Sequence, residues 1–277
     1  MVGVREVPRV CLGFPASSAT ATTRGSKFAR SGPANVTELP CGCSVLPMSK
    51  HVTREQVARE LASTAETLPI VAQLAGFFTE KRMFDSFDDF ADEGFKLVKH
   101  PEYKMMSGTH RLLPGYIFKK YNNDKDGQLL NYMRRIEGAR LLRRFIEERD
   151  YQHVTAPRKW LYELPSGFPE RYLLIAEKLD LASERSTLRH YGSLSKKQTV
   201  ELARVLYYFR GLNSTPANLP FTTDDKIAFI DTERWANDKD YLRKVGDRLS
   251  PSRREQAESI YRGLRKRGEK PFRSAFK

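Results

Sequence analysis

The stretch from Gly211 to Glu233 constrains the fold of this chain more than any other. Its sequence, GLNSTPANLPFTTDDKIAFIDTE, predicts a polar loop, a turn and then an apolar strand over 227–230 that stops at Asp231. A carboxylate at the end of a buried strand is costly unless a cation or hydrogen-bond donors meet it. We therefore expect Asp231 to belong to a polar site, the plainer alternative being a residue that caps a turn or a helix.

Two capping boxes mark where helices begin. Thr53 and Ser195 are each followed three residues later by a glutamine that can bond back to the cap. The first of these helices is expected to break at Pro69. Together with apolar positions at helical spacing, these signals predict helices over 53–83, 128–149, 195–211 and 252–267.

Short runs of aromatic and β-branched residues predict strands between these helices. The run Tyr172–Ala176 is continuously apolar, as expected for a strand buried on both faces. Residues 178–190 are polar, and no element is predicted there. The predicted strands are 95–98, 103–110, 116–121, 159–164, 172–177 and 227–230.

The net charge of +14 is concentrated at the two ends of the chain. Residues 243–277 carry twelve basic and four acidic side chains, and residues 1–50 carry six basic and two acidic ones. A basic terminal helix is most often a solvated face; the alternative is that 243–277 binds an acidic protein, RNA or an anionic lipid surface. The nearly balanced middle argues against a nucleic-acid interface there.

Residues 1–50 are rich in Ser, Thr, Ala, Gly and Pro, and we expect them to be disordered. Their arginines and few acids leave organelle targeting open. The three cysteines all lie in this segment, which fits a reducing compartment, and we expect a cytoplasmic protein. No apolar run approaches the roughly 20 residues of a membrane span, so no transmembrane segment is predicted.

The order of elements over about residues 95–235 resembles the protein-kinase-like superfamily, in an atypical or degenerate form. The resemblance implies an α+β, two-lobed fold with a reduced C-terminal lobe, because only 46 residues follow Asp231. The predicted divisions are a disordered extension (1–50), a helical segment (51–94), a kinase-like N-lobe (95–180) and a reduced helical C-lobe with a basic C-terminal helix (181–277).

The same resemblance implies a site for ATP and Mg2+. Lys119, in the run Tyr116-Ile117-Phe118-Lys119, would bind phosphates, and Glu137 on the next helix would pair with it. Lys120 would point to the opposite face of the strand. The plainer alternatives are edge-strand lysines in solvent and an ordinary surface pair of Glu137 with a neighbouring arginine. Glu177 and Leu179 mark the hinge that would meet the adenine.

Asn218 and Asp231 would hold the metal, and Asn213 occupies the place where the family has a catalytic aspartate. An amide cannot accept a proton at neutral pH, which removes a general base worth about 10²–10⁴-fold in rate. Asp231-Thr232-Glu233 replaces the family's Asp-Phe-Gly, and Glu233 either adds a second carboxylate or faces solvent. The glycine-rich phosphate loop is reduced to Gly108 and Gly115.

These residues lead to two functional interpretations. The first is an atypical kinase-like enzyme that binds ATP and magnesium and transfers phosphate to a small molecule or a lipid head group. The second is a non-catalytic, pseudokinase-like binding module whose basic ends engage an acidic partner. Lys119, Asn218 and Asp231 favour the first interpretation, and Asn213 favours the second.

Overall fold

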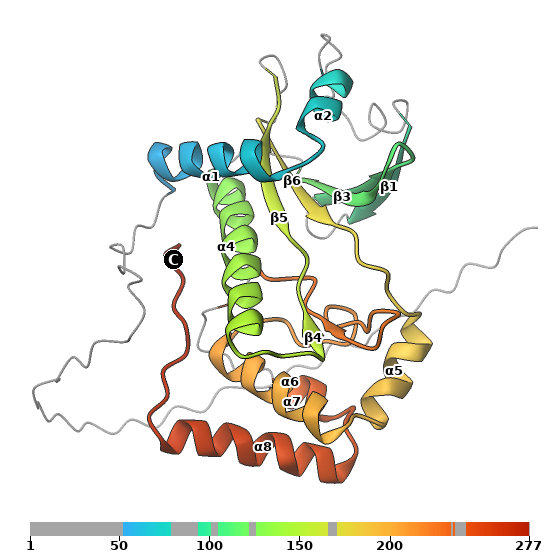
Figure 1. The fold of residues 1–277 in the computed structure, drawn as a ribbon, viewed down its shortest axis with the longest axis vertical. Coiled ribbons are helices and arrows are strands. Elements are labelled where there is room, and N and C mark those ends of the chain that lie inside the picture. The colour runs from blue at the N-terminus through green and yellow to red at the C-terminus, as the bar shows by residue number, and fades with distance from the viewer. Residues whose placement is uncertain are drawn as a thin grey trace, which may run out of the picture. The chain divides into compact units, whose positions relative to one another are not determined.

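The structure is a computed structural model that describes residues 52–78, 94–100, 105–121, 126–165, 171–233, 235 and 242–276. All of them belong to one compact unit, residues 45–277. It combines an antiparallel sheet with helices (Figure 1), which confirms the predicted mixture of α and β structure. Within the described ranges, every helix is too short or too polar to cross a bilayer.

The main sheet has five strands in the order β1-β2-β3-β6-β5, and all neighbours are antiparallel. The strands predicted from the sequence at these places are confirmed to within a few residues. Their bounds are β1 Phe95–His100, β2 Met105–His110, β3 Leu113–Tyr121, β5 Lys159–Glu163 and β6 Tyr172–Glu177.

The register of the sheet decides which β3 side chains share a face. Phe118 lies beside Ile175 of β6, and both belong to the apolar core under the N-terminal helices. Lys119, one residue further along, lies beside Leu174 and therefore points the other way. Lys120 is on the Phe118 side, as predicted, but it is only 3% exposed, so it is not an edge lysine in solvent.

The two N-terminal helices pack on different parts of the sheet: the first lies beside β5, with Val57 in the cluster that contains Leu161, and the second covers the Phe118 face. The capping box at Thr53 is present, with both of its hydrogen bonds, at the start of α1 (Arg54–Thr67). As predicted, the helix stops before Pro69, and α2 (Val71–Phe77) follows. Leu74 and Phe78 are completely buried in the core beneath them. The predicted continuation over 79–83 lies outside the described residues.

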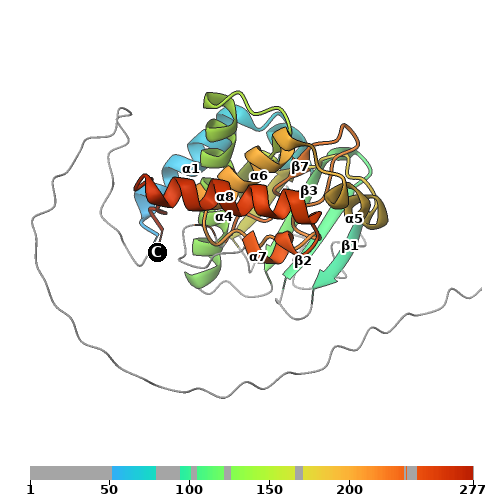
Figure 2. The ribbon, with the colours of Figure 1, turned by 90° about the horizontal axis from the view of Figure 1, so that it is seen from below.

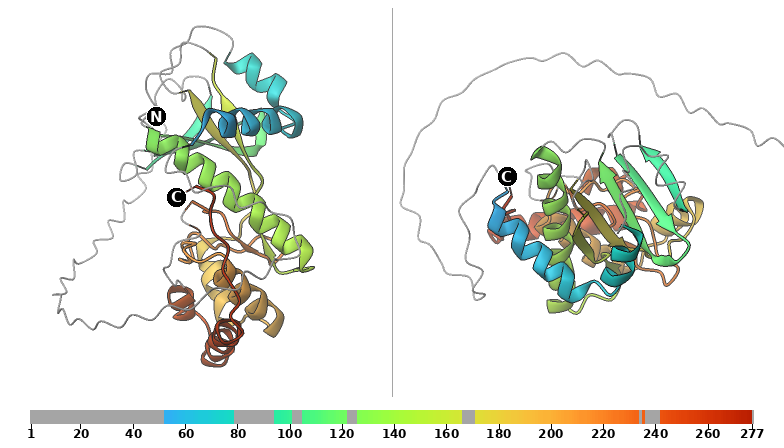
Figure 3. Two further views of the ribbon diagram at one scale, coloured as in Figure 1. Left: turned by 90° about the vertical axis from the view of Figure 1, so that its left-hand side faces the viewer. Right: turned by 90° about the horizontal axis from the view of Figure 1, so that it is seen from above.

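The long helix α4 (Asp126–Glu148) packs against the opposite face, next to β5 (Figures 1 and 3). Met133 and Ile136 lie in one core cluster with Leu161 of β5 and Leu174 of β6. This is also the face on which Lys119 lies, so α4 and Lys119 share one side of the sheet.

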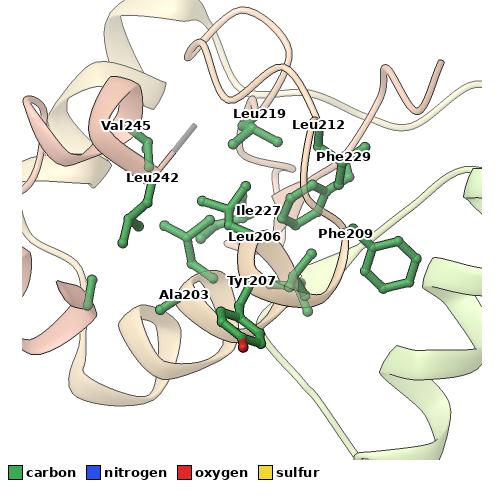
Figure 4. Close-up of a cluster of buried hydrophobic side chains, with 14 of the residues drawn as sticks. Ala203, Leu206, Tyr207, Phe209, Leu212, Leu219, Ile227, Phe229, Leu242 and Val245 are labelled. Atoms are coloured by element: carbon green, nitrogen blue, oxygen red, sulfur yellow. The ribbon is translucent and has the colours of Figure 1, made fainter. Parts of the chain in front are cut away.

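The C-terminal half is mainly helical and has its own apolar core (Figure 4). Helix α6 begins at the capping box of Ser195, as predicted, and buries Leu202, Val205 and Leu206. The basic helix α8 packs on α6 (Figure 2). The helices here are α5 Glu184–Gly192, α6 Lys196–Tyr208, α7 Leu242–Gly246 and α8 Pro251–Lys266.

Three local predictions need correction. Residues 184–192 form α5, capped by Ser183, because Thr187 and Tyr191 at i,i+4 spacing give this polar segment one buried stripe. The short α7 was also not predicted. The strand before Asp231 is only β7 (Ile227–Ala228); it runs parallel to β4 (Val154–Thr155), and Ile227 also forms an antiparallel bridge with Phe221.

Residues 268–276, which we call the C-terminal strap, return from the end of α8 along α4 (Figure 3). The Phe272 amide donates to the carbonyl of Tyr208, and the Phe272 ring lies 4.9 Å from the ring of Phe209. Phe276 is buried in the cluster that contains Met133 of α4. The strap therefore links the helical core to the helix that supports the sheet.

Candidate functional site

Five charged side chains meet where the sheet, α4 and the segment after β7 come together. We call them the charge cluster. Three are cations, from β3, β5 and α4, and two are carboxylates from the segment that follows β7. The five are Lys119, Lys159, Arg135, Asp231 and Glu233.

Arg135 is the centre of the charge cluster. Its side chain is 6% exposed and it bonds directly to the Glu233 carboxylate, with Nε 2.9 Å from Oε2. One of its terminal nitrogens also lies 3.8 Å from Oδ1 of Asp231. The same Glu233 oxygen accepts a hydrogen bond from the Tyr121 hydroxyl. A buried guanidinium thus holds both carboxylates, as charge-assisted pairing of buried ions requires.

Lys159 fixes the backbone on either side of Asp231. Its Nζ donates to the carbonyl of Ile230 at 3.1 Å and to the hydroxyl of Thr232 at 2.8 Å. The Thr232 hydroxyl in turn donates to the carbonyl of Arg135. The segment that carries Asp231 is therefore tied to both β5 and α4.

A glycine allows this segment to approach α4 closely. A Cβ at Gly138 would lie 2.5 Å from the Trp235 ring and 2.7 Å from the carbonyl of Thr232. The Trp235 indole nitrogen also donates to the carbonyl of Arg134. A larger residue at 138 would push the 232–235 segment away and displace the carboxylates from the charge cluster.

Lys119 and Asp231 are close enough to influence each other's ionisation, so the structure brings together the two residues on which the sequence argument depended. The pKa of Lys119 is lowered to about 8, mainly by burial and also by Arg135, while Asp231 and Glu233 oppose the change. For Asp231, burial raises the pKa, but Arg135, Lys159 and Lys119 outweigh burial and hold the pKa below its usual range. Both groups are charged at neutral pH.

Glu137, the expected partner of Lys119, has other contacts. Its carboxylate accepts hydrogen bonds from the Ser274 hydroxyl at 2.6 Å and the Ala275 amide at 2.9 Å, both on the C-terminal strap. Residues 135 and 137 lie on different sides of α4, because each helical residue turns the side chain by about 100°. The α4 residue that meets Lys119 is therefore Arg135, and this corrects the expected Lys119–Glu137 pair.

Glu177 and Leu179, the two residues predicted to mark the hinge, have different surroundings. Leu179 lines an open pocket of about 510 Å³, together with Ile117 of β3, the segment 178–181 and Thr223. Glu177 does not line it, because its carboxylate bonds to the backbone and side chain of Arg158. Ile117 and Lys119 are on the same face of β3, so the pocket and the charge cluster open on one side of the sheet.

The loop that carries Asn213 and Asn218 precedes β7 in the chain and lies beside the end of that strand. The Asn218 carbonyl accepts a hydrogen bond from the Ile230 amide, which places the loop backbone beside the strand end. Oδ1 of Asn213 is buried and has no hydrogen-bond partner among the described residues. The metal-binding and catalytic roles expected of these two side chains stay predictions.

The charge cluster does not suit magnesium. Mg2+ prefers carboxylate and other oxygen ligands in a negatively charged setting. Here both carboxylates already face Arg135, and Lys119 and Lys159 add two more cations around Asp231. Within the part of the chain that the structure describes, no group of three or more His, Cys, Asp or Glu side chains could hold a metal ion.

Sequence reasoning named Lys119, Asp231 and Glu233 but missed Arg135 and Lys159. A signal for Arg135 was available, because it lies three residues after Tyr132 and four before Ala139, on the buried stripe of α4. A charged residue on an apolar stripe needs a partner of opposite charge. Lys159 carried less signal, since a lysine at the start of a strand is usually exposed.

The basic C-terminal helix is partly neutralised within the chain. Arg254 pairs with Asp247 and Glu258, and Arg253 bonds to the carbonyl of Leu194. Arg262 and Arg265 are exposed on the same helix. Binding of an acidic protein, RNA or a lipid surface by residues 243–277 stays a prediction.

No family model matches the sequence, and no curated protein matches it. Among solved structures, the chain is similar to the GDP and kanamycin complex of APH(2")-IIia, with 10% identity, a TM-score of 0.35 and coverage of 61% of this chain and 77% of that one. It is also similar to the apoenzyme of macrolide 2'-phosphotransferase MphH from Brachybacterium faecium, with 10% identity, a TM-score of 0.32 and the same coverage.

Proposed function

We propose that this chain is an atypical kinase-like protein that binds ATP, with the charge cluster holding the phosphates. The observation that best supports this is the meeting of Lys119 and Asp231 on one face of the sheet, far apart in sequence and coupled electrostatically. Lys119 is only partly buried, and its ammonium group suits a phosphate chain.

The adenine would occupy the open pocket beside the charge cluster. Ile117 and Leu179 give it apolar walls, and the backbone of residues 178–181 offers peptide groups for hydrogen bonds. The Lys178 amide is already bonded to the carbonyl of Gly115, so the base would use other groups of this segment. The side of β3 that carries Ile117 also carries Lys119, two residues further on, where the phosphates would extend.

The proposed reaction is transfer of the terminal phosphate to a hydroxyl of a small molecule or a lipid head group. Such a transfer depends mainly on positioning and on electrostatic stabilisation, which Lys119, Lys159 and Arg135 would supply. Asn213 cannot act as the general base, so we expect slow turnover. No step is assigned to a metal ion, because Arg135 already holds the carboxylates.

A non-catalytic nucleotide-binding module is the second candidate. Asn213 favours it, and so does the direct bonding of Glu233 to Arg135, which also lies 3.8 Å from Oδ1 of Asp231. The two candidates share the nucleotide site; they differ in turnover and in the acidic partner that the basic ends of the binding module would engage.

A thermal-shift measurement with ATP tests the shared part of the proposal. Ligand at about 100 times its Kd should stabilise the folded chain by about 2.7 kcal/mol and raise Tm by several degrees. Lys119→Met should remove the shift, and Lys96→Met, which changes an exposed lysine on β1, should keep it. No shift in the wild-type chain at millimolar ATP would reject nucleotide binding. Release of ADP, above that of Lys119→Met, would then separate the enzyme from the binding module.

A further inference from the structure

The basic residues of α8 and the C-terminal strap fall into two groups. In the first half of α8 they are engaged within the chain; Arg254, for example, pairs with both Asp247 and Glu258. The second group consists of six exposed cations at the end of α8 and on the strap, and we call it the basic face. Its members are Arg262, Arg265, Lys266, Arg267, Lys270 and Arg273.

The basic face has little negative charge to balance it. Glu269 is the one acid between positions 262 and 273, and its carboxylate is already engaged. It accepts a hydrogen bond from the Tyr208 hydroxyl and lies 3.8 Å from Nε of Arg267. Within the described part of the chain, the other five cations have no ion-pair partner. Their charges face solvent together, and such a concentration of charge attracts a polyanion.

An exposed aromatic ring lies on the same segment. Phe272 is 37% exposed, although its ring centroid lies 5.7 Å from that of Phe145 and 4.9 Å from that of Phe209. Its amide also donates to the carbonyl of Tyr208. These contacts hold the ring in place, so a group that stacks on its exposed part finds it already ordered. The end of α8 and the strap lie on one side of the molecule, which faces the viewer in the left panel of Figure 3.

The chemistry of this surface favours nucleic acid over lipid or protein. The apolar stripe of α8, which includes Tyr261 and Leu264, is buried in the C-terminal core, so this helix has no apolar stripe to insert into a bilayer. Among the described residues of α8 and the strap, Phe272 is the one large apolar side chain that is exposed, and a protein interface needs a larger apolar centre. Cations for a phosphate backbone beside an aromatic ring for a base are typical of single-strand binding surfaces.

We infer that the basic face and Phe272 bind single-stranded RNA, with the cations contacting the phosphates and one base stacked on the ring. A single strand is required, because only unpaired bases can be splayed out and stacked on an aromatic side chain. None of these residues belongs to the charge cluster, so the inference does not depend on the proposed nucleotide site. It narrows the predicted binding of an anionic partner by residues 243–277 to one class.

Fluorescence anisotropy of a labelled uridine oligonucleotide of about 12 residues, titrated with the full chain, tests the inference. Affinity should fall about 100-fold between about 50 and 200 mM salt, because about five cations displace counterions from the strand. An abasic strand of the same length keeps the charge but offers no base, so it should bind about fivefold more weakly or worse. No binding of the uridine strand at about 50 mM salt, or equal affinity for the abasic strand, would overturn the inference.

A matched pair of double variants separates the basic face from the general basicity of the chain. Arg265→Gln with Lys266→Gln removes two charges of the basic face, and Lys196→Gln with Lys197→Gln removes two exposed charges at the start of α6. RNA affinity should fall about tenfold or more for the first variant and less than about twofold for the second. Equal losses would show that only net charge matters, and the inference would fail.

Phe272→Leu and Phe272→Tyr test the ring. The leucine variant keeps an apolar side chain but removes the stacking surface, so RNA affinity should fall about fivefold or more with the salt dependence unchanged. The tyrosine variant keeps the ring and should bind within about twofold of the wild-type chain. Thermal unfolding of both variants checks that the strap is still packed. A leucine variant that folds normally and binds RNA as tightly as the wild-type chain would contradict the stacking of a base.

Two competitors distinguish the other classes of partner. Polyglutamate represents an acidic protein, and vesicles that contain phosphatidylserine represent an anionic membrane surface. Per negative charge, each should displace the labelled RNA about tenfold less effectively than unlabelled RNA does. Displacement by either competitor as effective as that by RNA would show that the surface accepts any polyanion, and the assignment to RNA would be wrong.

Discussion

Two sides of α4 use buried charge in different ways. On the sheet side, Arg135 joins a charge cluster in which cations outnumber carboxylates. On the strap side, Glu137 is satisfied by two neutral donors, Ser274 and Ala275. The strap side thus meets one buried charge with hydrogen bonds, whereas the sheet side brings charges of both signs together, with the pKa of Lys119 and of Lys159 lowered by burial. One side of α4 thus carries the candidate site, and the other holds the C-terminal strap.

The largest effect is expected from Gly138→Ala, which breaks the sheet side alone. The added Cβ would overlap the Trp235 ring and the Thr232 carbonyl, at 2.5 and 2.7 Å. Overpacking of this kind costs about 3 kcal/mol of unfolding free energy, which urea denaturation measures. Gly263→Ala in α8 is the control, because its nearest neighbour is the end of a flexible arginine at 3.5 Å. Equal stability of the two variants would show that the 232–235 segment is not packed as closely as described.

Glu137→Ala breaks the strap side. It leaves the Ser274 hydroxyl and the Ala275 amide without their acceptor and should cost about 2 kcal/mol. The same denaturation series measures it, with ATP binding as the second readout. ATP affinity should stay within about twofold, because Glu137 is not in the charge cluster. A tenfold loss of affinity would mean that the two sides of α4 are not separable.

The pH dependence of ATP binding sharpens the comparison on the sheet side. Because burial lowers the pKa of Lys119 to about 8, the lysine is mainly charged at pH 7 and mainly neutral at pH 9. Phosphate binding favours the charged form, so Kd should rise about tenfold over this range, or about 1.4 kcal/mol.

The other groups of the charge cluster determine how this profile is read. Burial also raises the pKa of Tyr121, to about 12, and the pKa of Asp231 is lowered, so neither changes charge between pH 7 and 9. The pKa of Lys159 is lowered in the same direction as that of Lys119. The difference between the pH profiles of the wild-type chain and Lys119→Met therefore gives the contribution of Lys119 to the pH dependence of ATP binding. A wild-type profile that is flat from pH 7 to 9 would exclude a lysine of lowered pKa from the binding site.

The sign of the stability effect is opposite. Because the pKa of Lys119 is lower in the folded chain than in the unfolded one, unfolding takes up a proton between pH 8 and the usual value of 10.5. The contribution of Lys119 to stability therefore improves as pH rises through this window, while ligand binding weakens.

The smallest effect is expected from Arg140→Met. Arg140 makes two hydrogen bonds to Glu60 of α1, at 2.9 and 2.6 Å, but its side chain is 51% exposed. Exposed pairs contribute about 0.5 kcal/mol and are screened by salt. Thermal unfolding at low and high salt measures this contribution. A loss of more than about 2 kcal/mol of unfolding free energy would show that the contact with α1 stabilises α4 as strongly as the contacts on its sheet side and its strap side.

Local signals predicted most of the regular structure, because capping and turn chemistry act within a few residues. The capping boxes at Thr53 and Ser195 and the break at Pro69 are all present. Helix α5 was not predicted, because its buried stripe consists of only Thr187 and Tyr191 in a polar segment.

The site was harder to predict, since its charged members come from four separate segments. Lys119 and Asp231 could be named because each follows an apolar run. The choice of Glu137 over Arg135 followed a spacing rule, and only packing decides which side of a helix meets the sheet. The contact of Glu137 with the strap involves residues more than a hundred positions away, and a local sequence pattern carries no information about such a contact.

The packing of Trp235 has a practical use. The chain has two tryptophans, and both indole nitrogens are hydrogen-bonded, Trp160 to Thr67 and Trp235 to the carbonyl of Arg134. Trp235 lies four positions after Asp231 and against the helix that carries Arg135. In a Trp160→Phe background its intrinsic fluorescence would report on the 231–235 segment alone, so that emission wavelength and quenching can follow occupancy in real time without a label.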